Sequence, residues 1–305
     1  MYYCGWDGGG TKTEVCILGP DGQEQACASF GPLNVNGAAL ETVAQTARDC
    51  VAFMASQPGG CGSCAALVIG MAGVSNQNAA ALLEKAVRAA GYRGKLRIVG
   101  DQEIALSGAV QGPGAVLIAG TGAICFGKDQ QGNPFRVGGY GYLIDDGGSG
   151  YAIGRDILAA AARAVDGRGP VTALRDMVFS QLNVSDIGGV ITWLYRPETG
   201  KKEVASLAPL LLRALETGDA AAQAIAVKAA KDLAELAITA WRKTGMTGGE
   251  LALTGSVMNH YPLIRAQTEA LIRAALPDAV LLSPRHRPAR GAALLAIAEI
   301  EKNKA

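Results

Sequence analysis

The sequence predicts an α/β protein with two domains of related topology, on two observations. A unit of strand, Gly/Thr loop, strand, turn and strand occurs twice, about 110 residues apart, and an internal duplication outranks any single motif as a fold signal. Apolar strand-like runs also alternate with helical stretches between and after these units. This alternation predicts largely parallel strand pairing beside each antiparallel unit.

The two copies share one plan. The first has apolar runs at residues 2–6, 14–18 and 23–30, with a Gly-rich loop and a Pro-Asp-Gly turn between them. The second has its strands at residues 115–119, 123–127 and 135–137, around the tight loop Gly120-Thr121-Gly122. The Gly/Pro cluster at residues 111–114 is the best candidate boundary, so we expect domains at residues 1–111 and 112–289.

The remaining elements follow from apolar periodicity and from capping residues. Strands are predicted at residues 65–70, 96–99, 250–253 and 280–282. Helices are predicted at residues 38–56, 103–110, 152–165, 171–181, 187–195, 204–216, 220–243, 261–275 and 290–301. A further helix, capped by Ser75 or Asn76, is expected to run to Ala90, with Gly91 as its stop.

Composition excludes several classes of function. Lys and Arg total 28 against 27 Asp and Glu, and this near-neutral balance argues against a nucleic-acid partner. Only two His are present, which excludes sites that need several histidines. Gly contributes 41 of 305 residues, roughly twice the usual share, so we expect loops that approach a ligand closely.

Cysteine usage and the termini point to a cytoplasmic protein. Seven scattered Cys predict reduced thiols, and the Cys61–Cys64 pair is either incidental or a redox or metal pair. The first residues lack a basic signal region, and the longest uncharged stretch is broken by Pro and Gly. We therefore expect neither secretion nor a membrane span.

The Gly/Thr loops are candidate phosphate-binding sites. Neither a P-loop nor a Rossmann fingerprint occurs, but residues 8–10 are three successive glycines whose N–H groups can face phosphate oxygens. Thr11 and Lys12 add a hydroxyl and a charge, and Asp7 suits a Mg²⁺ hydration shell. The alternative is a plain hairpin, although two such loops in matching places favour one shared polyphosphate. The loop at residues 254–256 fits a nucleoside contact.

Asp101 is the candidate catalytic base. It follows the strand at residues 96–99, and α/β folds place ligands at strand C-termini. A carboxylate there can accept a hydroxyl proton during phosphoryl transfer. The alternatives are that Asp101 caps the next helix, or that Glu103 is the base, although Glu103 is more typical of a helix-dipole partner.

The densest Gly cluster, at residues 138–150, suits a polar ring. Tyr140 and Tyr142 can cover its C–H face, and Asp145 and Asp146 can accept its hydroxyls. An ordinary loop or a Ca²⁺ loop is the alternative, but the EF-hand spacing is absent. Asn34 is a further candidate ligand contact, and Asn36 is the better helix cap.

Together these motifs resemble the BadF/BadG/BcrA/BcrD ATPase family of the sugar kinase/Hsp70/actin superfamily. The matching segments are DGGGTKT at residues 7–13, GPLN at 31–34, GTG at 120–122, GGYGY at 138–142 and TGS at 254–256. Within that family, GDQEIAL at residues 100–106 and KKEVASL at 201–207 are most similar to kinases of N-acetylglucosamine and N-acetylmuramic acid.

The resemblance implies two RNase H-like, actin-like ATPase domains with a central cleft, and ATP- and Mg²⁺-dependent phosphorylation of a sugar 6-hydroxyl. It implies that the terminal helix, residues 290–303, packs on the first domain, and that the protein is a homodimer. The implied base is Asp101, and Asp7 would order Mg²⁺ through water. The implied ATP contacts are Gly9, Gly10, Thr11, Lys12, Thr121, Gly122, Gly255 and Ser256. The implied sugar contacts are Asn34, Ala123, Ile124, Tyr140, Gly141, Tyr142 and Asp146.

Three departures from the family pattern leave the choice of amino sugar open. Asp145 and Gly147 replace a Gly and a Glu, and Ala123 replaces a Ser. Tyr140 and Tyr142 stand where Trp and His are usual. Glucosamine is therefore a further acceptor to consider. The other functions to test are an ATPase that activates a 2-hydroxyacyl-CoA dehydratase or benzoyl-CoA reductase system, and a non-catalytic sugar sensor.

Overall fold

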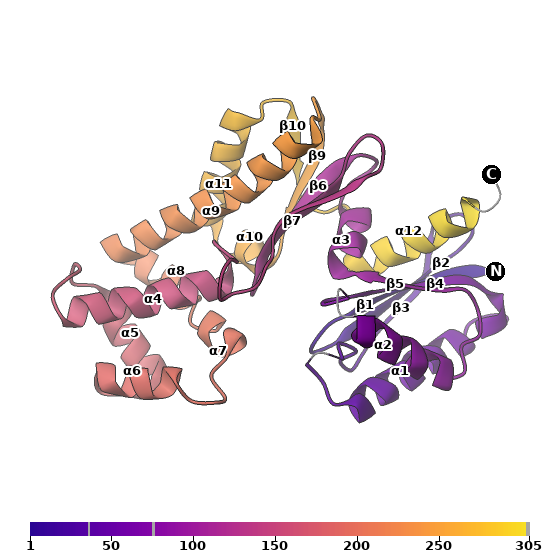
Figure 1. Ribbon diagram of the computed structural model, residues 1–305, viewed down its shortest axis with the longest axis horizontal. Helices are drawn as coiled ribbons and strands as arrows, with labels where there is room; N and C mark the ends of the chain where they lie inside the picture. Colours follow the sequence, from indigo (N-terminus) through magenta and orange to yellow (C-terminus); the bar gives the residue numbers. More distant parts are fainter. Residues whose placement is uncertain (36, 75–76, 303–305) are drawn as a thin grey trace. The chain divides into compact units, whose positions relative to one another are not determined.

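The chain forms two compact units in this computed structural model, which describes residues 1–35, 37–74 and 77–302 (Figure 1). Unit 1 comprises Met1–Gly112 together with the C-terminal segment from Pro284, and unit 2 is Pro113–Ser283. Each unit is built around its own five-stranded sheet. The helix caps expected at Asn36 and at Ser75 or Asn76 lie outside the described residues.

Unit 1 contains a mixed sheet in the order β3-β2-β1-β4-β5. Its strands are β1 (Tyr2–Gly8), β2 (Thr13–Leu18), β3 (Glu24–Phe30), β4 (Cys64–Met71) and β5 (Leu96–Gly100). The first three strands form an antiparallel meander, while β4 and β5 run parallel to β1. The parallel strands therefore end at the same edge as the β1–β2 loop.

The two faces of this sheet are covered by different helices, because successive side chains of a strand point to opposite faces. Cys4 and Trp6 pack in the core with α1 (Leu40–Ala55) and α2 (Gln77–Ala89). Tyr3 packs on the other face with α3 (Asp101–Ala109) and α12 (Pro288–Glu301). Figure 1 shows these two helix pairs on either side of the sheet. Asp7, four residues after Tyr3, therefore belongs to the α3/α12 face.

The C-terminal helix α12 returns to unit 1 and packs against β1 through small residues. A Cβ at Gly5 would lie 2.2 Å from the Ala293 nitrogen, and one at Gly291 would lie 2.1 Å from the Ile104 carbonyl oxygen. Such a close approach of the backbones requires glycine at both places. The structure also groups residues 284–289 with unit 1, whereas the sequence assigned them to the second domain. The physical reason is that the His286 N–H donates to the Gly108 carbonyl at 2.7 Å.

Unit 2 repeats the sheet of unit 1 strand for strand. Its order is β10-β9-β6-β7-β8, formed by β6 (Gly114–Ala119), β7 (Ala123–Lys128), β8 (Pro134–Gly138), β9 (Gly249–Thr254) and β10 (Ala279–Leu282). Again three antiparallel strands are followed by two that run parallel to the first. The predicted duplication, and with it the α/β fold of two related halves, is confirmed.

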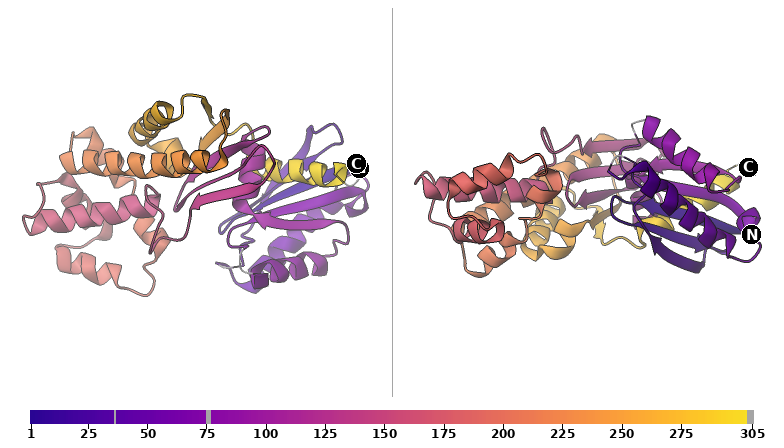
Figure 2. Two further views of the ribbon diagram at one scale, coloured as in Figure 1. Left: turned by 45° about the horizontal axis from the view of Figure 1, so that its top comes forward. Right: turned by 90° about the horizontal axis from the view of Figure 1, so that it is seen from below.

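Helices inserted between β8 and β9 enlarge unit 2. They are α4 (Gly150–Val165), α5 (Ala173–Leu182), α6 (Ile187–Leu194), α7 (Lys201–Ala205), α8 (Leu210–Glu216) and α9 (Ala220–Thr244). Helices α10 (Ser256–His260) and α11 (Pro262–Ala275) follow β9. Figure 2 shows α4 and α9 side by side, and the core of the unit lies between these helices and the sheet.

Two helix predictions in unit 2 were wrong in detail. The helix predicted at residues 204–216 is two helices, α7 and α8, because a proline at position 209 cannot continue the hydrogen-bond ladder of a helix. Lys201, which lies before the predicted helix, begins α7, and Ser256, expected in a loop, begins α10. Within the described residues, no helix has the length and apolar character required to cross a membrane.

Candidate functional site

The loop between β1 and β2 has one face held by the protein and one face open. The Gly9 N–H donates to the Lys12 carbonyl at 3.0 Å, which closes the turn, and the Gly9 carbonyl accepts from Leu33 at 3.1 Å. Gly10 and Thr11 are exposed, and their N–H groups donate to no backbone carbonyl of the described residues. Of the three successive glycines, Gly10 is therefore the one whose N–H can face an anion.

Asn34 lies directly beside this loop. Its N–H donates to the Gly9 carbonyl at 3.3 Å, and its own carbonyl accepts from Ala38 at 3.1 Å. The Thr13 hydroxyl, which is fully buried, donates to the Gly31 carbonyl at 2.8 Å and ties the same segment to β2. The structure therefore brings the predicted sugar contact Asn34 to the predicted phosphate loop.

Asp7 and Asp101 form an acidic pair at the C-terminal edge of the unit 1 sheet. Asp7 is the last residue but one of β1, and Asp101 is the first residue of α3, directly after β5. Burial, followed by the charges of Asp101 and Glu14, raises the pKa of Asp7 to about 6, against a smaller opposing effect of Lys12. The Asp7 carboxylate therefore carries a charge that its protein surroundings do not balance.

The structure distinguishes Asp101 from the alternative base, Glu103. Asp101 is exposed, and its carboxylate accepts the Gln102 N–H at 3.0 Å. The residue in the N-cap position of α3 is Gly100, so Asp101 is not the cap of this helix. Glu103 is half-buried and forms an ion pair with Arg97 at 3.4 Å. Asp101 is therefore the acid presented at the sheet edge, while Glu103 has a structural partner.

The corresponding loop of unit 2 is much more tightly held. The Gly120 N–H donates to the Gly122 carbonyl at 2.9 Å and closes the loop. The Gly120 carbonyl accepts from Gly150 at 2.7 Å, and the Thr121 carbonyl accepts from Tyr151 at 3.3 Å. The first N–H groups of α4 therefore hold the loop by hydrogen bonds, while Thr121 stays exposed.

Asp146 is the second support of this loop. It is 2% exposed and has a positive φ of 64°. One carboxylate oxygen accepts the Ala123 N–H at 3.1 Å, and the other pairs with the Lys201 ammonium at 2.7 Å. Both oxygens of this predicted sugar contact thus have protein partners. Sequence reasoning missed Lys201 as a site residue, because its partner lies 55 residues earlier in the chain.

A cavity beside the Gly120–Gly122 loop is also lined by Ser256, a predicted ATP contact. This cavity of about 360 Å³ is lined on one side by Gly120 and Thr121 and on another by Ser256 and Tyr261. Its lining is mostly apolar and includes α7, α8 and α10 residues. Gly255 shapes it: with φ of 99°, a Cβ there would lie 2.3 Å from the Ala119 carbonyl oxygen. The cavity is large enough for a small ligand of ring size.

The Gly-rich segment after β8 presents aromatic rings. Tyr140 is 64% exposed, and Arg136 stacks over its ring at 4.8 Å. Tyr142 is half-buried, with its ring edge-on to Tyr151 at 4.8 Å between centroids. The Tyr140 N–H donates to Asp145 at 3.0 Å, which orders the loop.

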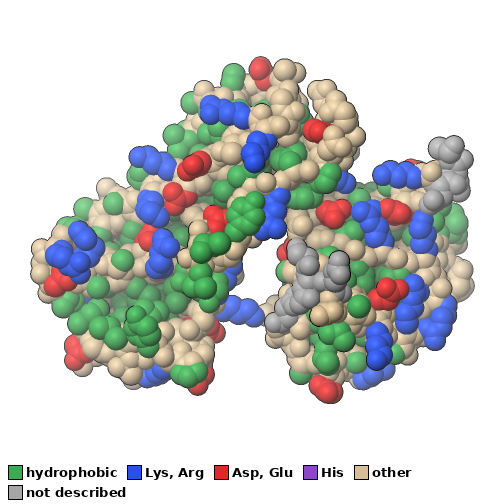
Figure 3. Space-filling view, in the orientation of Figure 1, with side chains coloured by type: hydrophobic (Ala, Val, Ile, Leu, Met, Phe, Trp, Pro, Cys, Tyr) green, Lys and Arg blue, Asp and Glu red, His purple; other side chains and the backbone are tan. Residues whose placement is uncertain are grey.

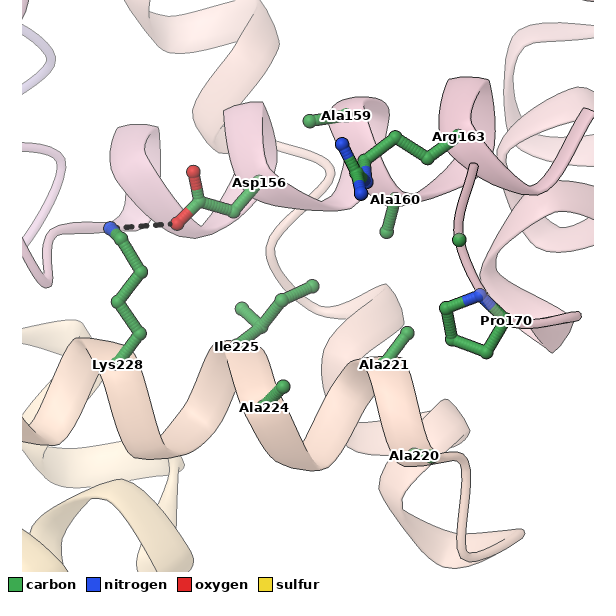
Figure 4. Close-up of a pocket in the computed structure, with 11 residues that line it drawn as sticks. Asp156, Ala159, Ala160, Arg163, Pro170, Ala220, Ala221, Ala224, Ile225 and Lys228 are labelled. Atoms are coloured by element: carbon green, nitrogen blue, oxygen red, sulfur yellow. Dashed lines mark ion pairs between the residues drawn. The ribbon is translucent and has the colours of Figure 1, made fainter. Parts of the chain in front are cut away.

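A second cavity, between α4 and α9, is separate from these predicted residues. It has a volume of about 320 Å³, and Figure 4 shows its alanine-rich walls, with the Asp156–Lys228 ion pair of 3.0 Å at one end. None of the residues singled out from the sequence lines it.

Comparison with known protein families finds one match. The model of the BadF/BadG/BcrA/BcrD ATPase family matches residues 4–296. The chain belongs to this family.

Its relatives include named sugar kinases. The chain is 31% identical to an N-acetylmuramic acid/N-acetylglucosamine kinase of Clostridium acetobutylicum, over 98% of this chain and 99% of that protein. It is also 31% identical to an N-acetyl-D-glucosamine kinase of Dictyostelium discoideum, over 97% of both chains. A crystal structure from Chromobacterium violaceum, of a protein named as an N-acetylglucosamine kinase, superimposes with a TM-score of 0.78 at 26% identity and covers 97% of this chain and 98% of that one. This likeness confirms the predicted actin-like ATPase fold.

The departures from the family pattern have a structural counterpart at Gly147. A Cβ at this position would lie 3.1 Å from the Cβ of Asp232, and 3.2 Å from its carboxylate. An acidic side chain from α9 therefore occupies the space where a side chain on residue 147 would begin. The other departure, Ala123, is 2% exposed and uses its N–H to bind Asp146.

Five of the seven cysteines are buried, whereas Cys27 is exposed and Cys61 half-buried. Cys125 is fully buried in β7, and burial raises its pKa to about 12. Cys64 is buried and Cys61 half-buried; their pKa values are raised by burial, in Cys64 to about 11. These three thiols are protonated at neutral pH, so none of them is set up as a redox nucleophile.

Proposed function

We propose that this protein is a kinase that transfers the γ-phosphoryl group of ATP to the 6-hydroxyl of an amino sugar. The observation that carries the proposal is the exposed Asp101 beside the half-buried Asp7, at the sheet edge where the Gly/Thr loop of unit 1 lies. Membership of an ATPase family and kinship to two named amino-sugar kinases support it. The proposed phosphoryl acceptors are N-acetylglucosamine and N-acetylmuramic acid.

In the proposed reaction Asp101 accepts the proton of the sugar hydroxyl as its oxygen attacks the γ-phosphorus. The bond from the γ-phosphorus to the bridging oxygen breaks, and ADP leaves with the electron pair. Thr11, Lys12 and the Gly10 N–H would bind phosphate oxygens from unit 1, and Thr121 and Gly122 from unit 2. The proposal requires both loops to act on one nucleotide, whose nucleoside would occupy the cavity at Ser256.

Asp7 fits the role of a Mg²⁺ partner. Its carboxylate is destabilised by burial and by Asp101, so a divalent cation would relieve an unbalanced charge. Mg²⁺ is usually held by one or two carboxylates together with waters and phosphates, which matches this acidic pair. When bound, Mg²⁺ would neutralise the charge of the phosphates.

Four of the proposed sugar contacts are exposed or half-buried: Asn34, Tyr140, Gly141 and Tyr142. An aromatic face covers the apolar side of a sugar ring, and an amide side chain donates to a hydroxyl. For Ala123, Ile124 and Asp146 the contacts favour a supporting role. A Cβ at Gly139 would lie 3.0 Å from Ile124, so this side chain packs under the sugar loop.

We further propose a homodimer. Hydrophobic side chains gather over α5 and α6 in Figure 3, where Ile191 is 52% and Tyr195 82% exposed. Contiguous apolar surface of this kind typically marks an interface. Light scattering should report twice the chain mass, and Tyr195→Asp should shift it to the mass of a monomer.

Measuring ADP release across a panel of sugars tests the proposed reaction. The panel is N-acetylglucosamine, N-acetylmuramic acid, glucosamine, N-acetylmannosamine and glucose, each with ATP and Mg²⁺. We expect release with one or both of the first two sugars and none without sugar. Sugar-independent hydrolysis would favour the activator ATPase, and sugar binding without any ADP release would favour a sensor.

A further inference from the structure

Lys201 places an ammonium group at the Gly/Thr loop of unit 2. It begins α7, and its Nζ lies 2.7 Å from the buried Asp146 carboxylate. A Cβ added to Gly122 would lie only 2.8 Å from this Nζ. The lysine side chain is therefore in contact with the loop itself, and glycine at position 122 leaves room for it.

The same carboxylate holds both the loop and the lysine. One oxygen of Asp146 binds the Ala123 N–H and the other binds Lys201, so a single buried acid sets their separation. The Tyr142 ring, 5.9 Å from Nζ, flanks the ammonium. The Lys201 side chain is still 31% exposed. An ammonium has three donors, so the bond to Asp146 leaves donors for a further acceptor.

We propose that Lys201 binds a γ-phosphoryl oxygen of ATP held at the Gly120–Gly122 loop, and that Asp146 is the positioning residue for it. The inference rests on the proposed use of ATP at this loop. The charge that develops during phosphoryl transfer is stabilised by preorganised cations, and a lysine fixed by a buried acid is such a cation.

The test compares two nucleotides on the Lys201→Met variant. We expect the affinity for the non-hydrolysable analogue AMP-PNP to fall about tenfold or more, because a charged hydrogen bond is lost. The affinity for ADP, which has no γ-phosphate, should change less than about twofold. The kcat should fall with either amino sugar, and Lys201→Arg should restore part of it. Lys202→Met removes an exposed charge one residue away and should change none of these values.

Three outcomes would overturn the proposal. Equal losses for ADP and AMP-PNP would mean that Lys201 merely supports the loop. A loss confined to N-acetylmuramic acid, with N-acetylglucosamine unaffected, would mean that it binds the carboxylate of the acceptor. Unchanged nucleotide affinities would remove it from the site. Since nucleotide binding is measured without sugar, these results stay separate from a wild-type protein that phosphorylates no amino sugar.

Discussion

The β1–β2 loop of unit 1 and the β6–β7 loop of unit 2 occupy the same place in two copies of one sheet, yet their surroundings differ in charge. The comparison uses the second-to-last residue pair before each loop. Between β1 and β2 this pair is Asp7 opposite Glu14, and between β6 and β7 it is Ile118 opposite Ile124. Unit 1 therefore places acids under its loop, and unit 2 places aliphatic side chains there.

The loops also differ in how they are held. The unit 1 loop closes on itself through Gly9 and Lys12 and leaves Gly10 and Thr11 exposed. The unit 2 loop is fixed by the N-terminus of α4 and by Asp146, which recruits Lys201 from α7. On the proposed function, one fold would support two kinds of chemistry: an acidic edge for a cation and a hydroxyl proton, and a tightly held loop for phosphate.

The largest effect is expected from a substitution of the acid at the sheet edge of unit 1. Asp101→Asn should lower kcat about 10²- to 10⁴-fold, because the proton of the hydroxyl has no acceptor. Binding of an ATP analogue, measured by calorimetry, should persist. Glu103→Gln is the matched control, since Glu103 pairs with Arg97, and it should leave kcat within a few fold. Normal turnover by the Asp101 variant would remove this residue as the base.

The second prediction concerns the rigidity of unit 2. Gly255→Ala should lower the free energy of unfolding by about 3 kcal/mol or more, because the new Cβ would meet the Ala119 backbone at 2.3 Å. Chemical denaturation measures this loss. Gly245→Ala is the control: its φ is also positive, at 63°, but no atom lies within 4 Å of the added Cβ. A Cβ in the left-handed conformation should cost only about 1–2 kcal/mol, and equal losses would refute the steric argument.

The third prediction uses the raised pKa of Asp7. A carboxyl whose folded pKa is about 6 instead of 3.8 stabilises the fold below pH 4 and loses that contribution as the pH rises through 6. Asp7→Asn should therefore stabilise the protein relative to wild type, by up to about 3 kcal/mol at pH 8 and by much less at pH 4. Urea denaturation at both values checks this. Asp49→Asn, at an exposed acid, should show no such trend, and a pH-independent gain for Asp7→Asn would contradict the assignment.

The smallest effects come from the two loop threonines. Thr11→Ala and Thr121→Ala should each raise the KM for ATP about 2- to 10-fold, the value of one hydrogen bond to a phosphate oxygen. Because both hydroxyls are exposed, the melting temperature should hardly change. If only one variant shows the effect, the two loops do not share one nucleotide.

Much of this fold could be predicted because its signals are local. Alternating apolar residues and Gly turns determined both three-stranded meanders, and the predicted strands fall within a few residues of the observed ones. The split of residues 204–216 into α7 and α8 was missed, although Pro209 was visible, because apolar periodicity on both sides of it suggested one helix. The short α10 was missed because five residues carry too little periodicity to register.

The candidate site likewise combines residues that the sequence could single out with properties that only packing decides. Sequence alone singled out Asp7, Asp101 and both Gly/Thr loops as candidates, since glycine and strand-end acids are recognisable by their type and position. Only the tertiary structure decided which acids are buried or paired. Burial and then the charge of Asp101 raise the pKa of Asp7, and Asp146 pairs with Lys201, far away in the chain. The physical reason is that desolvation and ion pairing depend on which distant segments pack together, and no local pattern encodes that.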